Sequence, residues 1–84
     1  MRTRAEELTR RADAAAQAKE YSRARRGYEA ALEVSPGFIP ARLGAAEAAW
    51  QLGRRDEART IYKALVDELP EGLVPPIARA RAAP

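Results

Sequence analysis

Two stretches of the sequence, ARRGYEAALEVSP (Ala24–Pro36) and ARTIYKALVDELP (Ala58–Pro70), share a frame that decides the fold. In each, a tyrosine follows the first alanine by four residues, and a proline closes the stretch eight residues after the tyrosine. Apolar residues in the second stretch recur at steps of three and four, a spacing that predicts an amphipathic helix. We therefore interpret each stretch as one copy of a repeated helical unit.

The repeat extends upstream of these helices. Ala12–Pro36 aligns without a gap with Ala46–Pro70, and nine of the twenty-five positions are identical. Five are alanine pairs, which an alanine-rich chain supplies partly by chance; the other four are Gln17/Gln51, Arg25/Arg59, Tyr28/Tyr62 and Pro36/Pro70. A period of about 34 residues built from two helices indicates a known class of helical repeat.

Polar caps, prolines and glycines predict the boundaries of the first two helices. Thr3, with Glu6 three positions later, predicts a capping box at the start of a helix that ends near Ala18. Lys19–Tyr21 is interpreted as a tight turn, and Ser22 as the N-cap of the second helix. Ser35-Pro36-Gly37 then ends that helix after Val34.

The same signals divide the second half of the chain. Pro40 opens a third helix that reaches Leu52, and Gly53 is the expected stop. A fourth helix begins at Arg55 or Asp56 and ends near Leu69-Pro70. Beyond it, Pro75-Pro76 leaves room for one short helix.

At this point the sequence resembles the tetratricopeptide repeat family. The resemblance rests on a small residue, an aromatic residue four later, a small or apolar residue three after that, and a closing proline. The residues are Ala24, Tyr28, Ala31 and Pro36, then Ala58, Tyr62, Leu65 and Pro70. The resemblance implies that the small residue lets the helices approach closely and that the aromatic residue fills the space between repeats. It also implies that the proline ends the repeat.

The resemblance implies an all-α fold: antiparallel helix-turn-helix repeats stacked as a short right-handed superhelix, with four main helices and a short C-terminal helix. We predict a single domain over residues 1–84. Its first repeat covers about 5–38, its second about 39–72, and a capping stub covers 73–84. The alternative is a generic alanine-rich four-helix bundle in which the period is a coincidence.

The first helix of each repeat matches the family pattern less well. Only the small residue is kept there, as Ala12 and Ala46 in place of the family's glycine. The pair Leu43-Gly44 lies two positions out of register, so it is not counted as the family's Leu-Gly motif.

Composition argues against most kinds of chemistry. The 84 residues include no cysteine and no histidine, which leaves out disulfides, thiolate metal sites and the usual general base. We therefore expect no enzyme, no cofactor and no metal. The net charge is +3, but acidic and basic residues are interleaved, so nucleic acid is not an expected partner. Because no apolar run approaches the ~20 residues of a membrane span, we expect a cytoplasmic protein with no membrane contact.

If the resemblance holds, the first helices of the repeats line a groove that binds a protein or peptide. The family's groove positions fall on Thr9, Asp13, Ala16 and Gln17 in the first repeat and on Leu43, Glu47, Trp50 and Gln51 in the second. Two acidic residues in this set, Asp13 and Glu47, favour a peptide with basic residues. No Lys and Asn clamp for a terminal carboxylate is expected, because the matching positions carry other residues.

Trp50, the only tryptophan, replaces Ala16 of the first repeat. It is either a partner-binding anchor or a packing residue, and the sequence leaves both alternatives open. A second functional class is self-assembly into a homo-oligomer, because about three repeats are usually needed for stability and only two are complete. The apolar face for that contact is Ile61, Leu65, Val66 and Leu69.

Overall fold

A computed structural model describes residues 2–83, which fold into five α-helices whose ends lie at the turn signals of the sequence. The elements are α1 (Arg4–Gln17), α2 (Tyr21–Val34), α3 (Ile39–Gln51), α4 (Arg55–Glu68), the 3-10 turn η1 (Glu71–Leu73) and α5 (Pro76–Ala82). Residues 2–83 contain no strand. The prediction of an all-α fold with four main helices and a short C-terminal helix is confirmed. Within the same residues, no helix is both long and apolar enough to cross a bilayer.

The capping box predicted for the first helix is present. Thr3 precedes α1, and its hydroxyl oxygen accepts a hydrogen bond from the backbone N–H of Glu6 at 3.1 Å. The Glu6 carboxylate in turn accepts from the backbone N–H of Thr3, also at 3.1 Å. These hydrogen bonds hold the pKa of Glu6 below its usual value, because they favour the ionised carboxylate.

The start of α2 differs from the prediction. α2 begins at Tyr21, and its N-cap residue, Glu20, makes no side-chain capping bond. The prediction that Ser22 is the N-cap is therefore wrong. The reason is the backbone of Lys19, which adopts a left-handed conformation with φ of 60°. The N–H groups of Lys19 and Glu20 donate to carbonyls of the last turn of α1 at 2.9 Å each, and this reversal lets α2 start earlier than predicted.

The turn between α3 and α4 has the same geometry at the equivalent place in the second repeat. Gly53 has φ of 82°, and the N–H groups of Gly53 and Arg54 donate to the last turn of α3 at 3.0 and 2.9 Å. The predicted stop at Gly53 is confirmed. Both helical hairpins therefore reverse through the same hydrogen-bonding pattern, the Schellman motif.

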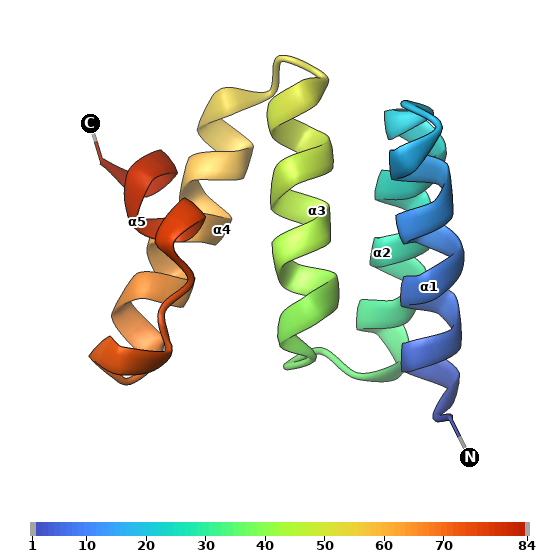
Figure 1. Cartoon of the computed structure of the whole chain (residues 1–84), viewed down its shortest axis with the longest axis horizontal. Helices are drawn as coiled ribbons and strands as arrows, with labels where there is room; N and C mark the ends of the chain where they lie inside the picture. The colour runs from blue at the N-terminus through green and yellow to red at the C-terminus, as the bar shows by residue number, and fades with distance from the viewer. Residues whose placement is uncertain (1, 84) are drawn as a thin grey trace.

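Consecutive helices pack against one another along the chain. In Figure 1, α1, α3 and α5 lie on the near side of the molecule, and α2 and α4 lie behind them. α2 also contacts α3, so the second hairpin stacks on the first. The Arg25 guanidinium on α2 donates to both carboxylate oxygens of Glu57 at 2.7 and 3.1 Å, which connects the start of α4 to the first hairpin.

The core consists of two clusters in which alanine predominates. One lies among α1, α2 and α3 and contains Ala12, Ala15, Ala24, Tyr28, Ala31, Ala41, Ala45 and Ala48. The other lies among α3, α4 and α5 and contains Ala46, Ala49, Ala58, Tyr62, Val74 and Ala78. Ile61 packs against both clusters and so connects them. Small side chains let the helices approach closely, which maintains dense packing in a short chain.

Each tyrosine of the repeat packs toward the next repeat, as predicted. The Tyr28 ring lies directly against Gly44 of α3, where an added Cβ would overlap the ring carbons. Tyr62 is fully buried in the second cluster together with Ala78 of α5, which is the counterpart of Gly44 one repeat later. A small residue on the following helix therefore accompanies each aromatic ring.

Candidate functional site

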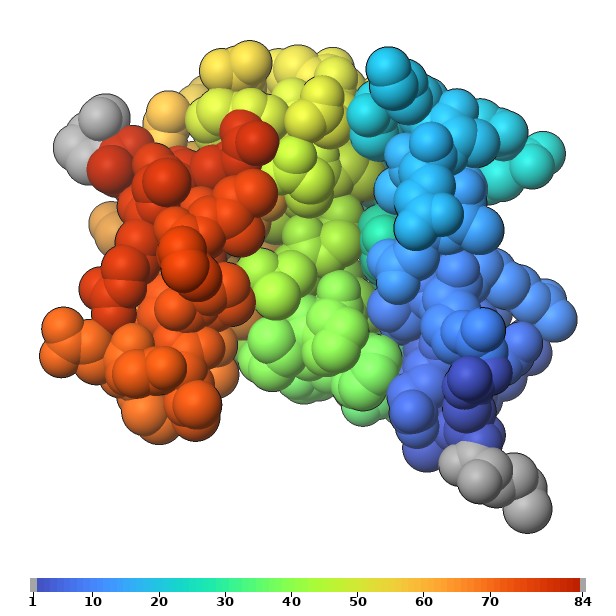
Figure 2. Space-filling view, in the orientation of Figure 1, coloured from blue at the N-terminus to red at the C-terminus, as the bar shows by residue number. Residues whose placement is uncertain are grey.

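The predicted groove residues come from helices that share one face of the molecule. We call the face formed by α1, α3 and α5 the A-helix face. Figure 2 shows this face, which has a shallow furrow on each side of α3. The family resemblance implies partner binding on this face, so its side chains form the candidate site.

Three residues at the spacing of the repeat mark this face. Asp13 on α1, Glu47 on α3 and Arg81 on α5 occupy equivalent positions along their helices. The first two are groove residues predicted from the sequence, whereas Arg81 was not among them. The charge in this row is therefore negative on α1 and α3 and positive on α5, and the positive charge of Arg81 pairs with Glu47.

Each acid of this row accepts a hydrogen bond from the tyrosine fifteen residues later. The Tyr28 hydroxyl donates to Asp13, and the Tyr62 hydroxyl donates to Glu47 at 2.7 Å. Burial raises the pKa of both tyrosines above the ordinary value of 10, and the hydrogen bonds to the carboxylates raise it further. Sequence reasoning treated these tyrosines as packing residues alone. The repeated spacing of acid and tyrosine was the signal that could have revealed the bonds.

Glu47 has three hydrogen-bonding neighbours and is held more firmly than Asp13. Besides Tyr62, it accepts from the Gln51 amide at 2.9 Å and from the Arg81 guanidinium at 3.1 Å. Asp13 is exposed and, within residues 2–83, has no ion-pair partner. The two acids that sequence reasoning treated alike therefore differ electrostatically: Arg81 neutralises Glu47, whereas Asp13 keeps its charge.

Trp50 packs on the second core cluster and keeps part of its surface exposed. The guanidinium carbons of Arg55 and Arg81 each lie 4.2 Å from the centre of its ring, which is the geometry of a cation–π contact. The structure thus gives Trp50 a packing role. Its role in binding a partner stays a prediction.

The other predicted groove residues vary in accessibility. Thr9 is 4% exposed, and its hydroxyl donates to the Ala5 carbonyl within α1 at 2.7 Å. Gln17 and Gln51 are exposed, and Leu43 is partly buried against the second cluster. Thr9 therefore offers a partner little surface, whereas the other groove residues are at least partly accessible.

The apolar face predicted for self-assembly lies beside α5. Leu65 is fully buried, and Ile61, Val66 and Leu69 are partly buried against the cluster that includes α5 residues. The large apolar residues exposed nearby are Leu73 and Ile77, at 69% and 41%. Self-assembly stays a prediction, with much of its predicted face covered by the chain itself.

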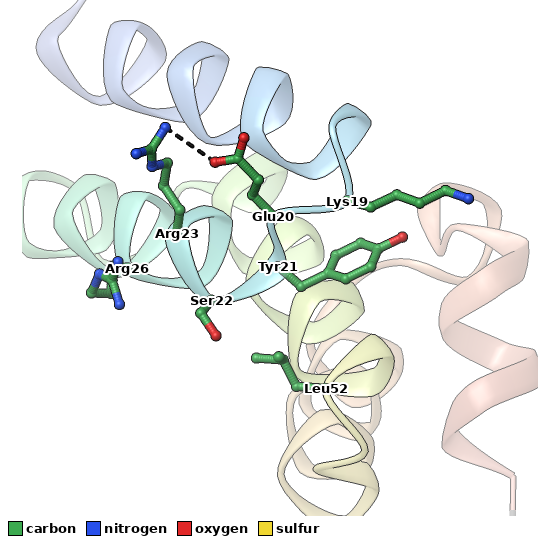
Figure 3. Close-up of a pocket in the computed structure, with 7 residues that line it drawn as sticks. All are labelled: Lys19, Glu20, Tyr21, Ser22, Arg23, Arg26 and Leu52. Carbon is green, nitrogen blue, oxygen red and sulfur yellow. Dashed lines mark ion pairs between the residues drawn. The ribbon is translucent and has the colours of Figure 1, made fainter.

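A separate hollow of about 440 Å³ lies where the α1–α2 turn approaches the end of α3. Figure 3 shows the residues that line it: Lys19, Glu20, Tyr21, Ser22, Arg23, Arg26 and Leu52. Glu20 and Arg23 form an ion pair at 3.1 Å, while the side chains of Lys19 and Arg26 point in different directions. The cationic groups do not converge, so we place no site there.

The comparisons with known proteins agree with the repeat. A sequence model of a family described as tetratricopeptide repeat matches residues 15–83, which is most of the chain. No curated protein and no solved structure matches the chain.

Proposed function

This chain belongs to the tetratricopeptide repeat family, and from that membership we propose that it is a non-catalytic module that binds a peptide or helix of a partner protein on its A-helix face. Repeats of this family generally mediate protein–protein interaction and are typically scaffolds, not enzymes. The proposal assigns the binding to Asp13, Gln17, Leu43, Glu47, Trp50 and Gln51.

The observation that supports the proposal is the combination of apolar and polar side chains on this face. Leu43 and Trp50 contribute partly exposed apolar surface, while Gln17 and Gln51 contribute exposed amides. Interfaces combine apolar anchors with polar groups that set register, and tryptophan is enriched among the anchors. The furrows on either side of α3 give an extended or helical segment room to lie against these groups (Figure 2).

Electrostatics favour a partner segment with a lysine or arginine near α1. Asp13 is exposed, and the Tyr28 hydroxyl that donates to its carboxylate is a neutral group, so no cation among residues 2–83 pairs with it. A cation placed there gains an ion pair without displacing one. We therefore refine the expectation of a basic partner: its basic side chain binds beside Asp13, at the furrow between α1 and α3.

A peptide array followed by titration tests the proposal. Immobilised twelve-residue peptides of varied sequence are probed with the purified protein, and selected peptides are titrated while amide chemical shifts are followed. We expect selected peptides to be enriched in Lys and Arg and to shift residues of α1 and α3. Asp13→Asn should weaken binding about tenfold, since one charge-assisted contact contributes about 1.5 kcal/mol.

The matched control is Asp67→Asn, which removes an exposed carboxylate from α4, a helix outside the A-helix face. This change leaves the net charge equal to that of Asp13→Asn but should leave binding unchanged. Equal effects of the two variants, or shifts confined to α2 and α4, would refute binding on the A-helix face.

A further inference from the structure

The contacts of Arg81 form an arginine-binding arrangement within the A-helix face. Its Nη2 donates to Glu47 Oε2 at 3.1 Å, while its buried Nε lies 3.1 Å from the other carboxylate oxygen in an ion pair without making a hydrogen bond. Its guanidinium carbon lies 4.2 Å from the centre of the Trp50 ring. We call Glu47 and Trp50 together the α3 cradle. A carboxylate paired with the edge of the guanidinium and an indole face stacked on its plane are the groups that recognise an arginine side chain.

The α3 cradle is held in place by groups other than Arg81. The Tyr62 hydroxyl and the Gln51 amide donate to different oxygens of Glu47, at 2.7 and 2.9 Å. Trp50 packs on the second core cluster, and Arg55 lies against its ring. Because these contacts fix the carboxylate and the indole, the cradle should keep its shape when the arginine leaves.

Arg81 stands where a partner would bind. It belongs to the same row as Asp13 and Glu47 and lies on the A-helix face, on a helix of only seven residues. α5 is attached mainly through Val74 and Ala78, which are buried in the second cluster, whereas the Arg81 side chain remains 21% exposed. The first repeat has no such arrangement, because Ala16 stands in place of Trp50 and Glu47 in place of Arg81.

We propose that the α3 cradle is a binding site for an arginine side chain of the partner, and that Arg81 occupies it in the absence of that partner. This inference rests on the proposed function for the source of the arginine, but the site can be tested without a partner. Arg81 then acts as an internal competitor: a partner arginine reaches Glu47 and Trp50 only after Arg81 leaves. The apparent affinity is the intrinsic affinity multiplied by the fraction of molecules in which the cradle is open.

The first test uses ethylguanidinium chloride as a probe of the empty cradle. In Arg81→Ala, we expect a saturable change in Trp50 fluorescence with half-saturation on the order of 10 mM, since one partly exposed ion pair and one cation–π contact are each weak. Wild-type protein should need an about three- to tenfold higher concentration for the same change, because Arg81 occupies the cradle in most molecules. The double variant Arg81→Ala/Glu47→Gln should show no saturable change. Ethylammonium chloride at equal concentration controls for ionic strength, and a response equal to that of ethylguanidinium would overturn the proposal.

A measurement on the wild-type chain covers the case in which Arg81→Ala alters the fold. A guanidinium stacked on an indole should carry side-chain proton resonances shifted upfield, so the Arg81 side-chain resonances should differ from those of Arg79. Trp50→Leu should abolish that difference. Arg81 resonances at ordinary positions in the wild type would overturn the proposal.

The second test measures the competition itself, with an arginine-containing peptide from the array. We expect Arg81→Ala to bind it about three- to tenfold more tightly than wild type, because the cradle is open in every molecule. The matched control is Arg79→Ala, which removes an exposed arginine of the same helix that donates to the Glu71 carbonyl. If no peptide binds on the A-helix face, the proposed function fails while the ethylguanidinium result stands on its own. A gain equal to that of Arg79→Ala, or none, would reject internal competition.

Discussion

At the residue scale, the tyrosines of the repeat have two physical roles in one side chain. Each ring fills the space between two repeats, and each hydroxyl donates to the acid of the same hairpin. A buried phenol needs a hydrogen-bond partner, and the acid fifteen residues earlier supplies it. Tyr28 and Tyr62 therefore couple the core to the A-helix face.

Removing these hydroxyls should destabilise the protein. We expect Tyr28→Phe and Tyr62→Phe each to lower the free energy of unfolding by about 1 kcal/mol at neutral pH, the usual net contribution of a hydrogen bond. Urea titrations followed by circular dichroism measure this. Tyr21→Phe, on a partly exposed tyrosine, is the control and should stay within about 0.5 kcal/mol of the wild type. Unchanged stability in the first two variants would show that the hydroxyls contribute nothing.

Tyr28 and Tyr62 also predict that the free energy of unfolding depends on pH in the alkaline range. The pKa of each buried tyrosine is raised above its ordinary value of 10, so the folded state favours the protonated phenol. The resulting stabilisation is fully present below pH 10 and is lost as pH rises from there toward the raised pKa. Urea unfolding from about pH 8 to 11 should therefore show a steeper decline for the wild type than for Tyr28→Phe/Tyr62→Phe. If the free energies of unfolding of the two proteins declined in parallel with pH, the raised tyrosine pKa would be contradicted.

At the scale of elements, the turns that end α1 and α3 show how one geometry is met by different residues. Gly53 adopts a left-handed backbone without steric cost, whereas Lys19 at the equivalent position has a Cβ that opposes it. Sequence reasoning identified the glycine but not the lysine, and so placed the cap of α2 at Ser22. A glycine after a helix predicts a left-handed backbone at that position, whereas a lysine there does not.

Lys19→Gly should therefore stabilise the protein by about 1 kcal/mol, because it removes the strain of a left-handed lysine. Gly53→Ala should destabilise it by a similar amount. Thermal unfolding monitored by circular dichroism measures both. Lys19→Ala separates the backbone effect from the loss of charge and should give no gain. Equal stabilisation by Lys19→Gly and Lys19→Ala would assign the effect to charge.

The contact between α2 and α3 predicts that a substitution at Gly44 strongly destabilises the protein. A methyl group there would overlap the Tyr28 ring carbons, so the ring or the helix must shift. We expect Gly44→Ala to cost about 1–3 kcal/mol despite the better helix propensity of alanine. Urea unfolding measures the loss, and the control is Gly37→Ala, where an added Cβ meets nothing within 4 Å. A stabilising Gly44→Ala would contradict this packing.

At the scale of the whole molecule, α5 covers the open end of the second repeat. Ala78 is fully buried in the second cluster, and Val74 lies there with it. We expect Ala78→Asp to displace α5, because a carboxylate cannot be buried there without a partner. The predicted self-assembly face, including Leu65, would then be uncovered.

Light scattering at several concentrations tests this expectation. Wild-type protein should stay monomeric, and Ala78→Asp should lose about 2–4 kcal/mol of stability and associate as concentration rises. Ala80→Asp, an exposed position in the same helix, is the matched control and should behave as wild type. Association of the wild type to the same extent as Ala78→Asp would favour the self-assembly alternative over peptide binding.

Most of the fold could be predicted from the sequence because its signals are local. The capping box at Thr3, the stop at Gly53 and the frame of Ala24, Tyr28 and Pro36 each depend on residues within a few helical turns. The candidate site was less predictable. The choice of Asp13 and Glu47 as groove residues came from the family resemblance, but their different electrostatic states could not be predicted, because the cation that neutralises Glu47 lies a full repeat further along the chain.

By itself, the sequence determined the helices, their period and the family, since caps, prolines and apolar spacing act within a short length of chain. Only the tertiary structure decided what meets across helices: Tyr28 against Gly44, the tyrosine hydroxyls on the acids, and Arg81 on Glu47 and Trp50. Ion pairs and cation–π contacts depend on distances of a few ångströms between residues far apart in the chain, and close packing of small side chains brings those residues together.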